Sequence, residues 1–413
     1  MRILLLHSSS DIYGASKIFL QTVQLLQSKG HTPVVVLSNQ GALSLALENC
    51  GVHVHIINLA ILRRKYFNIK GLMNRYQRWK QAVRELDYII TTHQIDTVYS
   101  NTAAVLVGGY IAKKRGLQHI WHLHEIIERP VFLHQFLAWC IKRWSDKIIV
   151  VSKAVEAHWQ DALQKPSTQE APSEPQMFQV YNGIQPIAAS KGISHDTHIG
   201  LNLPSLKLQY GIPDNALVIG MAARIHFWKG QPYFIDIARA LLRLEAAGKL
   251  NVKERPLYFV IAGDPFPGYE HLQKQMEQSI QQHAIGDRVF YIGLIPQMDR
   301  FYNAIDVLVL PSQQPDPLPT VVLEAMQFAI PVVATAQGGA LEMVIGKNEA
   351  VGLNLDPTGI FIPLNEVEKA AQIISSILIP ATLEKLGAAG KQRVDTYFSV
   401  ATFEKNILSV FEK

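Results

Sequence analysis

The first half of the chain alternates short apolar runs with segments of helical periodicity. Residues 2–7 form such a run, residues 15–28 follow with a helical pattern that ends at Gly30, and residues 33–37 form the next run. Apolar strands separated by helices predict βαβ units and a parallel sheet. The pattern continues with expected strands at residues 52–57, 96–100, 119–124 and 146–152.

A second series of the same kind begins near Ala216, after polar stretches at 165–175 and 186–204 that predict surface loops. Its expected strands cover residues 217–221, 257–262, 288–292, 307–310 and 331–335. A length of 413 residues suits two or three domains. The sequence therefore predicts an α/β protein of two tandem Rossmann-like doubly wound domains, residues 1–205 and 206–395.

The expected ligand site follows from this architecture. In open parallel sheets, ligands bind outside the carboxyl ends of the strands, so a cleft that the two domains face is the expected site. A closing amphipathic helix, from about residue 396 to 413, is expected to pack back on the first domain.

The composition of the chain bears on its cellular location and on the kinds of partner it can bind. Cys50 and Cys140 are too few for a disulfide framework or a multi-cysteine metal site, which predicts a reducing, cytoplasmic location. The apolar run at residues 3–6 is too short for a signal peptide, and no stretch of about 18 apolar residues is present to span a membrane. The net charge of +5 suits a phosphate-bearing substrate, an anionic lipid or a nucleic acid equally well.

The most informative segment runs from residue 311 to 326. A strand ends there, a proline-rich loop carries Asp316, and a helix expected from Thr320 carries Glu324. The free amides and dipole of a helix start form an anion site, and the two carboxylates could hold sugar hydroxyls on either side of a phosphate. The alternative is that both acids only stabilise the helix start.

Two cations follow the first strand of the second series. Arg224 comes at the end of that strand, and Lys229 lies in the loop before a helix, next to Gly230. Cations at this place can neutralise a leaving pyrophosphate by stabilising its developing charge. The alternative is a solvated basic loop.

Together these segments resemble retaining glycosyltransferases of the GT-B fold, family 4. The resemblance covers nearly the whole chain and includes residues 13–16, 224, 229–230, 261–264, 291–294, 304–312, 316–324, 331–335 and 338–339. The family's motif of two glutamates with seven residues between them maps onto Asp316 and Glu324. Asp316 is one methylene shorter than the usual glutamate, Pro319 replaces a glycine and Tyr13 replaces one of two loop glycines, which leaves the donor sugar open.

The resemblance implies a role for each matched position. Arg224 and Lys229 would grip the donor's phosphates, and Asp316 would contact the donor sugar. The remaining donor contacts would be Glu324 with the ribose, the peptide of Leu294 and Ile295 with the base, the amides of Thr320 and Val321 with the pyrophosphate, and the backbone at Gly14.

A histidine pair ends a strand of the first domain. Alternation along the strand places His122 and His124 on the same face, next to Glu125. The family often has a histidine here near the donor sugar and acceptor, and His124, nearer the strand end, is the favoured residue. The alternatives are a buried hydrogen-bonded pair and, with Glu125, a zinc site. The expected catalytic residues are thus His124, Asp316, Lys229 and Arg224.

No metal and no cofactor are expected. The chain has no Asp-x-Asp sequence, which metal-dependent glycosyltransferases of the other common fold use, and cations take the place of the metal at the phosphates. No Gly-x-Gly-x-x-Gly sequence follows the first strand, so a nicotinamide site loses its main support.

Residues 61–86 combine basic and aromatic side chains. The cations are Arg63, Arg64, Lys65, Lys70, Arg75, Arg78, Lys80 and Arg84, interleaved with Tyr66, Phe67, Leu72, Met73, Tyr76 and Trp79. Such a segment can lie on anionic lipid headgroups. No recognition motif for nucleic acid accompanies it, and a solvated helix face is the plain alternative.

The sequence thus favours a retaining, metal-independent transfer of sugar from a nucleotide-sugar to a glycan or lipid-linked acceptor. UDP is expected because it is the commonest nucleotide in the family. The alternatives are another GT-B sugar-nucleotide enzyme, such as an epimerase or phosphorylase, and a non-catalytic nucleotide-sugar-binding protein at a membrane. The expected location is cytoplasmic, attached to the inner face of the membrane.

Overall fold

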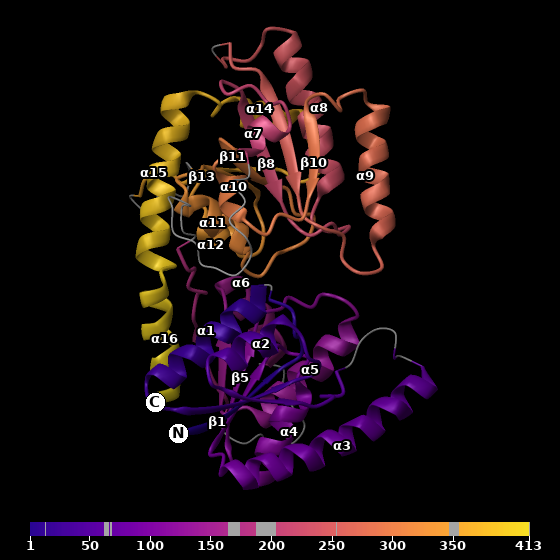
Figure 1. The fold of residues 1–413 in the computed structure, drawn as a ribbon, viewed down its shortest axis with the longest axis vertical. Coiled ribbons are helices and arrows are strands. Elements are labelled where there is room, and N and C mark those ends of the chain that lie inside the picture. Colours follow the sequence, from indigo (N-terminus) through magenta and orange to yellow (C-terminus); the bar gives the residue numbers. More distant parts are fainter. Residues whose placement is uncertain are drawn as a thin grey trace. The chain divides into compact units, whose positions relative to one another are not determined.

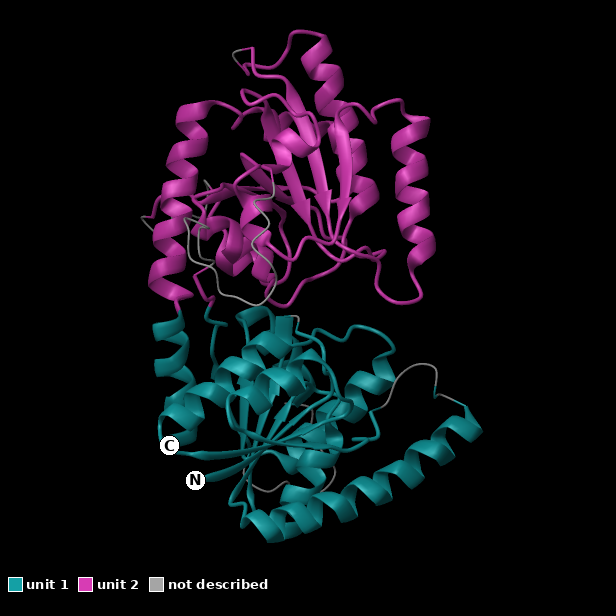
Figure 2. Cartoon of the chain, in the orientation of Figure 1, with its two compact units in different colours: residues 1–183, 400–413 teal, residues 184–399 magenta. Residues whose placement is uncertain are grey.

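The computed structural model describes residues 1–12, 14–61, 66, 68–163, 174–186, 204–252, 254–346 and 355–412. It consists of two compact units, Met1–Gly183 with Val400–Lys413, and Ile184–Ser399 (Figure 2). Each unit is a parallel sheet with helices on both faces (Figure 1). The predicted α/β class with two Rossmann-like domains is confirmed.

Within the described residues, the sheet of unit 1 has the strand order β3-β2-β1-β4-β5-β6-β7. The strands are β1 (Arg2–His7), β2 (Thr32–Leu37), β3 (His53–Ile56), β4 (Thr97–Asn101), β5 (Gln118–Leu123), β6 (Lys147–Val150) and β7 (Gln176–Gln179). The helices are α1 (Gly14–Ser28), α2 (Ala42–Asn49), α3 (Ile69–His93), α4 (Leu106–Arg115), α5 (Val131–Trp144), α6 (Lys153–Leu163) and α16 (Val400–Glu412).

The central strands of unit 1 are buried on both faces, which explains their continuous apolar runs. Ile3 and Leu5 pack against α1 and α2, whereas Leu4 and Leu6 pack against α3 and α4. The closing helix α16 joins the first of these cores through Phe403, and the buried Lys147 ammonium donates to the Val410 carbonyl at 2.7 Å. The C-terminal helix therefore belongs to unit 1.

Unit 2 repeats the arrangement with the strand order β10-β9-β8-β11-β12-β13 over its described residues. The strands are β8 (Leu217–Ala222), β9 (Leu257–Ala262), β10 (Val289–Gly293), β11 (Val307–Leu310), β12 (Val332–Thr335) and β13 (Gly359–Ile362). The helices are α7 (Leu206–Gln209), α8 (Gln231–Ala246), α9 (Glu270–Gln282), α10 (Met298–Tyr302), α11 (Thr320–Gln327), α12 (Ala340–Met343), α14 (Val367–Ser375) and α15 (Pro380–Tyr397).

The division between the units differs from the predicted one at residues 205 and 206. The chain enters unit 2 at Ile184, because this residue forms a parallel bridge with Ser399 and its amide donates to the Phe398 carbonyl at 3.0 Å. The return to unit 1 comes at Val400 rather than near residue 396. The predicted loop at 165–175 lies mostly outside the described residues, as does most of 186–204.

Candidate functional site

The carboxyl edge of the unit 2 sheet brings the loop of the two predicted cations next to the loop of Asp316. Arg224 and Lys229 follow β8, and the adjacent strand β11 leads into the loop that carries Asp316. The amide of Gln313 donates to the Trp228 carbonyl at 2.7 Å and joins the two loops. The two loops follow the adjacent strands β8 and β11, between which the strand order reverses, and this is where doubly wound folds bind ligands.

Lys229 and Asp316 form an ion pair in this structure, with side chains only 17% and 11% exposed. The Lys229 ammonium also lies 4.0 Å from the centre of the Trp228 ring. The sequence predicted both residues for the site, but it did not predict that they contact each other. A ligand phosphate reaching Lys229 would compete with Asp316 for the same ammonium.

Two glycines allow the close packing of these loops. Gly230 has φ of 84°, and a Cβ there would overlap the Pro311 carbonyl oxygen. Gly338 has φ of 58°, and a Cβ there would overlap the Asp316 backbone. The amide of Gly339 donates to the Asp316 carbonyl at 2.7 Å. Only glycine suits such left-handed positions against backbone, so Gly230 lets its loop lie against Pro311 and Gly338 lets its loop lie against Asp316.

The start of α11 carries the other predicted donor contacts. Thr320 and Val321 are its first residues, and the first amides of a helix have no acceptor within it. Glu324 is partly exposed and accepts a hydrogen bond of 2.8 Å from the Tyr302 hydroxyl. Burial, together with this carboxylate, holds the pKa of Tyr302 well above its ordinary value. Tyr302 therefore stays a donor and fixes the Glu324 side chain.

The remaining predicted positions of unit 2 lie at the same edge. Leu294 and Ile295 follow β10, with Leu294 exposed and Ile295 buried. The Arg224 guanidinium lies 5.6 Å from the centre of the Phe266 ring, and its backbone carbonyl accepts a bond of 2.9 Å from Gln231. In unit 1, Gly14 is the first residue of α1, with φ of 20° and open space beside it; Tyr13 lies outside the described residues.

The carboxyl edge of the unit 1 sheet holds the predicted histidines. His122 is fully buried near the end of β5, and His124 comes just after the strand and is partly exposed. Their ring centres are 4.1 Å apart, which confirms that they share a face. Of the two residues, His124 is therefore the one that is partly open to solvent.

A chain of hydrogen bonds leads inward from His124. Its Nε2 lies 2.9 Å from Asn101 Oδ1, Asn101 Nδ2 lies 2.9 Å from His7 Nδ1, and His7 Nε2 lies 2.9 Å from Ser16 Oγ. Sequence analysis missed His7, Asn101 and Ser16. The available signal was that His7 and Asn101 are the last residues of two central strands.

Burial keeps these histidines neutral. It lowers the pKa of His7 to about 4 and that of His122 to about 3. It also lowers the pKa of His124 well below the ordinary value, with His122 and His7 adding to the effect. This edge therefore offers uncharged hydrogen-bonding groups, unlike the charged edge of unit 2.

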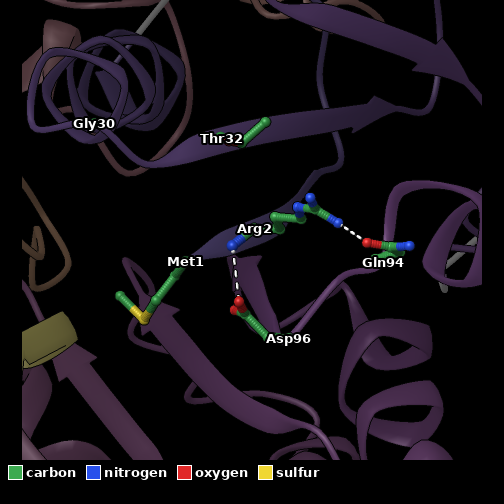
Figure 3. A pocket seen from close by; sticks show the side chains of 6 residues that line it. All are labelled: Met1, Arg2, Gly30, Thr32, Gln94 and Asp96. Carbon is green, nitrogen blue, oxygen red and sulfur yellow. Dashed lines mark hydrogen bonds between the residues drawn. The ribbon is translucent and has the colours of Figure 1, made fainter.

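A polar hollow of about 410 Å³ lies at the opposite, amino edge of the unit 1 sheet (Figure 3). Its lining includes Arg2 and Thr32 at the starts of β1 and β2. The Arg2 amide donates to Asp96 at 2.9 Å, and its guanidinium bonds to Gln94. These groups satisfy one another at the edge that parallel sheets do not use for ligands, so the hollow is structural.

No three His, Cys, Asp or Glu side chains within the described ranges are arranged to hold a metal ion. His122, His124 and Glu125, which the sequence left open as zinc ligands, are not arranged as such a group in this structure. Among the described residues no single helix is long and apolar enough to cross a membrane, and α14 with α15 meets that length and composition only as a pair bent by 93°.

Two family models match the chain, one on each unit. Residues 12–169 match "Glycosyltransferase Family 4", and residues 204–393 match "Glycosyl transferases group 1". Together the two matches cover most of the chain. They include Asp316, Glu324, Arg224 and Lys229 in the second match and His124 in the first.

Curated relatives carry related names. The chain is 26% identical over 311 residues, 72% of its length and 69% of the relative's, to the lipopolysaccharide 1,2-N-acetylglucosaminetransferase of Salmonella typhimurium. It is 24% identical over 208 residues, 50% of its length, to a lipopolysaccharide core biosynthesis mannosyltransferase of Rhizobium meliloti. It is 26% identical over 215 residues, 52% of its length, to an uncharacterized glycosyltransferase of Methanocaldococcus jannaschii. The matches span about half the length of these last two proteins, 54% and 47%.

Solved structures share the whole fold. HepE of Anabaena, crystallised with UDP and glucose, matches with a TM-score of 0.75 at 21% identity over all of both chains. A glycosyltransferase from Rickettsia africae matches with a TM-score of 0.75 at 19% identity, over 100% of this chain and 97% of the other. With two doubly wound units, each matched by its own family model, the chain belongs to the GT-B glycosyltransferases of family 4.

Proposed function

We propose that this protein transfers a sugar from a UDP-sugar to a glycan or lipid-linked acceptor, with retention of the anomeric configuration and without a metal ion. The observation that carries the proposal is the edge of the unit 2 sheet, where Arg224, the Lys229–Asp316 pair and the start of α11 converge. Cations and helix amides are the groups that bind a diphosphate. The names of the relatives support the acceptor class, and HepE with bound UDP supports the nucleotide.

In the proposed reaction the bond between the anomeric carbon and the diphosphate breaks, and a glycosidic bond forms to an acceptor hydroxyl that gives up its proton. Lys229 and Arg224 stabilise the charge on the departing diphosphate, with the amides of Thr320 and Val321. Asp316, released from Lys229, accepts hydrogen bonds from the donor sugar.

The other residues position the donor in this proposal. Glu324, oriented by Tyr302, binds the ribose hydroxyls, and the peptide of Leu294 and Ile295 lies on the base. The backbone at Gly14 contacts the donor. His124 hydrogen-bonds to the donor sugar near the acceptor.

A thermal-shift screen of nucleotide-sugars tests donor binding. A ligand at 100 times its Kd should stabilise the protein by about 2.7 kcal/mol, and UDP-sugars should do so where the other nucleotide-sugars do not. Slow hydrolysis of the bound donor would indicate a transferase rather than a binding protein. An epimerised or phosphorylated sugar as product would contradict the proposal.

Stereochemistry and metal use need separate measurements on the active enzyme. NMR of the product should show the anomeric configuration of the donor, and activity should persist in EDTA. An inverted product would contradict retention, and a loss restored by Mn²⁺ would contradict metal independence.

We further propose that the enzyme works in the cytoplasm, attached to an anionic inner membrane surface through α3. The first half of this helix projects from unit 1 (Figure 1) and exposes Ile69, Met73 and Tyr76 by 80%, 61% and 61%. These residues lie on one helix face. Tyr76, together with Leu72, which is 47% exposed, also borders the face that continues through Trp79 onto the core. An apolar face that continues outward from the core needs a partner.

Charge favours lipid as that partner. The described part of α3 carries the cations Lys70, Arg75, Arg78, Lys80 and Arg84, and the predicted cations Arg63, Arg64 and Lys65 lie outside the described residues. Each cation near an anionic surface contributes about 1 kcal/mol, which falls off within a Debye length. A few cations with two interfacial side chains suffice for reversible attachment.

Vesicle sedimentation tests this attachment. The protein should bind vesicles that contain anionic lipid at low salt, release at high salt and ignore neutral vesicles. Replacing Lys70, Met73, Tyr76 and Lys80 with Gln should abolish binding and leave donor binding intact. Tyr88→Gln is the matched control, because Tyr88 is 72% exposed on the second half of the same helix. A wild-type protein that ignores anionic vesicles at low salt would contradict the proposal.

A further inference from the structure

The hydrogen-bond chain behind His124 has a fixed direction. Asn101 is fully buried, His7 and Ser16 are almost fully buried, and each bond of the chain is 2.9 Å long. Asn101 stands at the centre, at the end of β4, with its amide oxygen toward His124 and its amide nitrogen toward His7.

The amide decides where the imidazole protons lie. An amide nitrogen can only donate, so His7 Nδ1 must be the unprotonated acceptor, and His7 carries its proton on Nε2 and donates it to Ser16. An amide oxygen can only accept, so His124 must carry its proton on Nε2. His124 Nδ1 is then left with a lone pair.

The surroundings hold this arrangement in place. Glu125 accepts hydrogen bonds from the amides of His124 at 3.0 Å and of Ala103 at 3.1 Å, which fixes the backbone at the end of β5. Thr102, which follows Asn101, has φ of 82°, a strained value for a β-branched residue. Such strain at the edge that binds ligands is typical of functional sites.

The titratable groups around His124 are His7 from β1, Tyr99 from β4, and His122 and Glu125 at the end of β5. The Tyr99 hydroxyl bonds to His122 Nδ1 at 2.5 Å, and burial raises the pKa of Tyr99 above its ordinary range. Burial raises the pKa of Glu125 as well. Tyr99 and the two neighbouring histidines are therefore uncharged at neutral pH, and Glu125 is the acid beside the ring.

We propose that Asn101 is a positioning residue that, backed by His7 and Ser16, holds His124 as the Nε2–H tautomer and presents Nδ1 as an acceptor for a substrate hydroxyl. The inference rests on the proposed transferase function for its last step. The tautomer itself depends only on the side chains of unit 1.

Asn101→Ala and Asn101→Asp test the kinetic part on the full chain. Asn101→Ala should lower kcat about 10- to 100-fold with little change in the KM for donor, the size of loss that removal of the orienting partner of a metal-bound histidine causes. Asn101→Asp cannot donate to His7 and adds a negative charge. It should raise the pH at which His124 gains a proton, and thus shift the acid limb of the kcat profile to higher pH.

Ser100→Ala is the matched control. Ser100 is also fully buried in β4, and its hydroxyl lies 2.9 Å from the Nε2 of a different buried histidine, His119. Its loss should lower stability as the Asn101 variants do but leave the pH profile unchanged. Equal profiles for all three variants would overturn the positioning role.

NMR decides the tautomer without any assay. In full-length protein labelled with ¹⁵N-histidine, long-range ¹H–¹⁵N correlations should show His124 as Nε2–H, with the signal identified by its loss in His124→Gln. Asn101→Ala should give a mixture of tautomers. Wild-type His124 as Nδ1–H would overturn the proposal. If UDP-sugars neither bind nor react, the proposed function fails and the tautomer result still stands.

Discussion

The two sheets share one topology, and their switch points hold different chemistry. In unit 1 the neighbouring central strands β1 and β4 end in His7 and Asn101, which join His124 in a chain of neutral hydrogen bonds. In unit 2 the loops after the equivalent strands β8 and β11 bring Lys229 to Asp316 as an ion pair. The same backbone arrangement thus supports a neutral edge in one unit and a charged edge in the other.

This difference agrees with the different roles that the proposed function gives to the two edges. Charged groups with helix amides suit a diphosphate, whose charge grows as it leaves. Neutral imidazoles and amides suit the hydroxyls of sugars, because they donate and accept without fixing a charge. The fold supplies the positions, and the side chains placed there decide what each edge binds.

Removing the charge from the unit 2 edge should have the largest effect. Lys229→Ala should lower kcat about 10²- to 10³-fold, because one preorganised group that stabilises the leaving diphosphate is lost. It also leaves Asp316 buried without its partner, which destabilises the fold. The double variant Lys229→Met with Asp316→Asn should therefore regain thermal stability but not turnover.

Lys369→Ala is the control for that experiment. Lys369 pairs with Glu366 at 3.2 Å on the surface of unit 2, where both side chains are exposed, so its loss should leave kcat unchanged. Full turnover by Lys229→Ala at unchanged stability would mean that the edge does not act on phosphate.

The next largest effect should come from acid, which should destabilise unit 1 more than unit 2. Burial holds the pKa of His7 at about 4 and those of His119 and His122 at about 3, below the ordinary value of 6.5 that they regain on unfolding. Between pH 6.5 and about 4 the unfolded chain binds more protons, so the free energy of unfolding decreases as the pH falls. Each histidine can contribute up to about 1.4 kcal/mol per pH unit.

Hydrogen exchange at pH 7 and pH 5 measures this contrast. Amides of β1, β4 and β5 should lose protection on acidification before those of β8 and β11. His119→Gln should reduce the pH dependence by removing one of these buried histidines. Parallel loss of protection in both units would show that the neutral edge is not the acid-sensitive part.

The smallest expected effect concerns the ribose contact. Glu324→Gln should raise the KM for donor about tenfold with little change in kcat, because a lost bond to a charged group weakens ground state and transition state alike. Tyr302→Phe, which removes the hydroxyl that orients Glu324, should act in the same direction and more weakly. A defect confined to kcat would move Glu324 from donor binding to the chemical step.

Much of this protein could be predicted from local patterns. Strand β1 shows why. A strand that is buried on both faces is a continuous apolar run, so the sequence predicts β1 at the residues where it forms. Two strands with weaker sequence patterns were not predicted. β7 (Gln176–Gln179) was missed, because it is short and partly exposed, and β13 (Gly359–Ile362) was missed although it is mostly buried. Arg224, Lys229, Asp316 and Glu324 could be predicted as site residues because their spacing along the chain resembles that of a family.

Contacts between residues far apart in the chain depended on the tertiary structure. Lys229 and Asp316 are 87 residues apart and His7 and Asn101 are 94 residues apart, and no periodicity links either pair. The boundary at Ile184 likewise depends on a bridge to Ser399. Local sequence decides which segments become strands, because burial and periodicity act over a few residues. Which strand ends become neighbours depends on the order of strands in each sheet, and that order alone brings these side chains together.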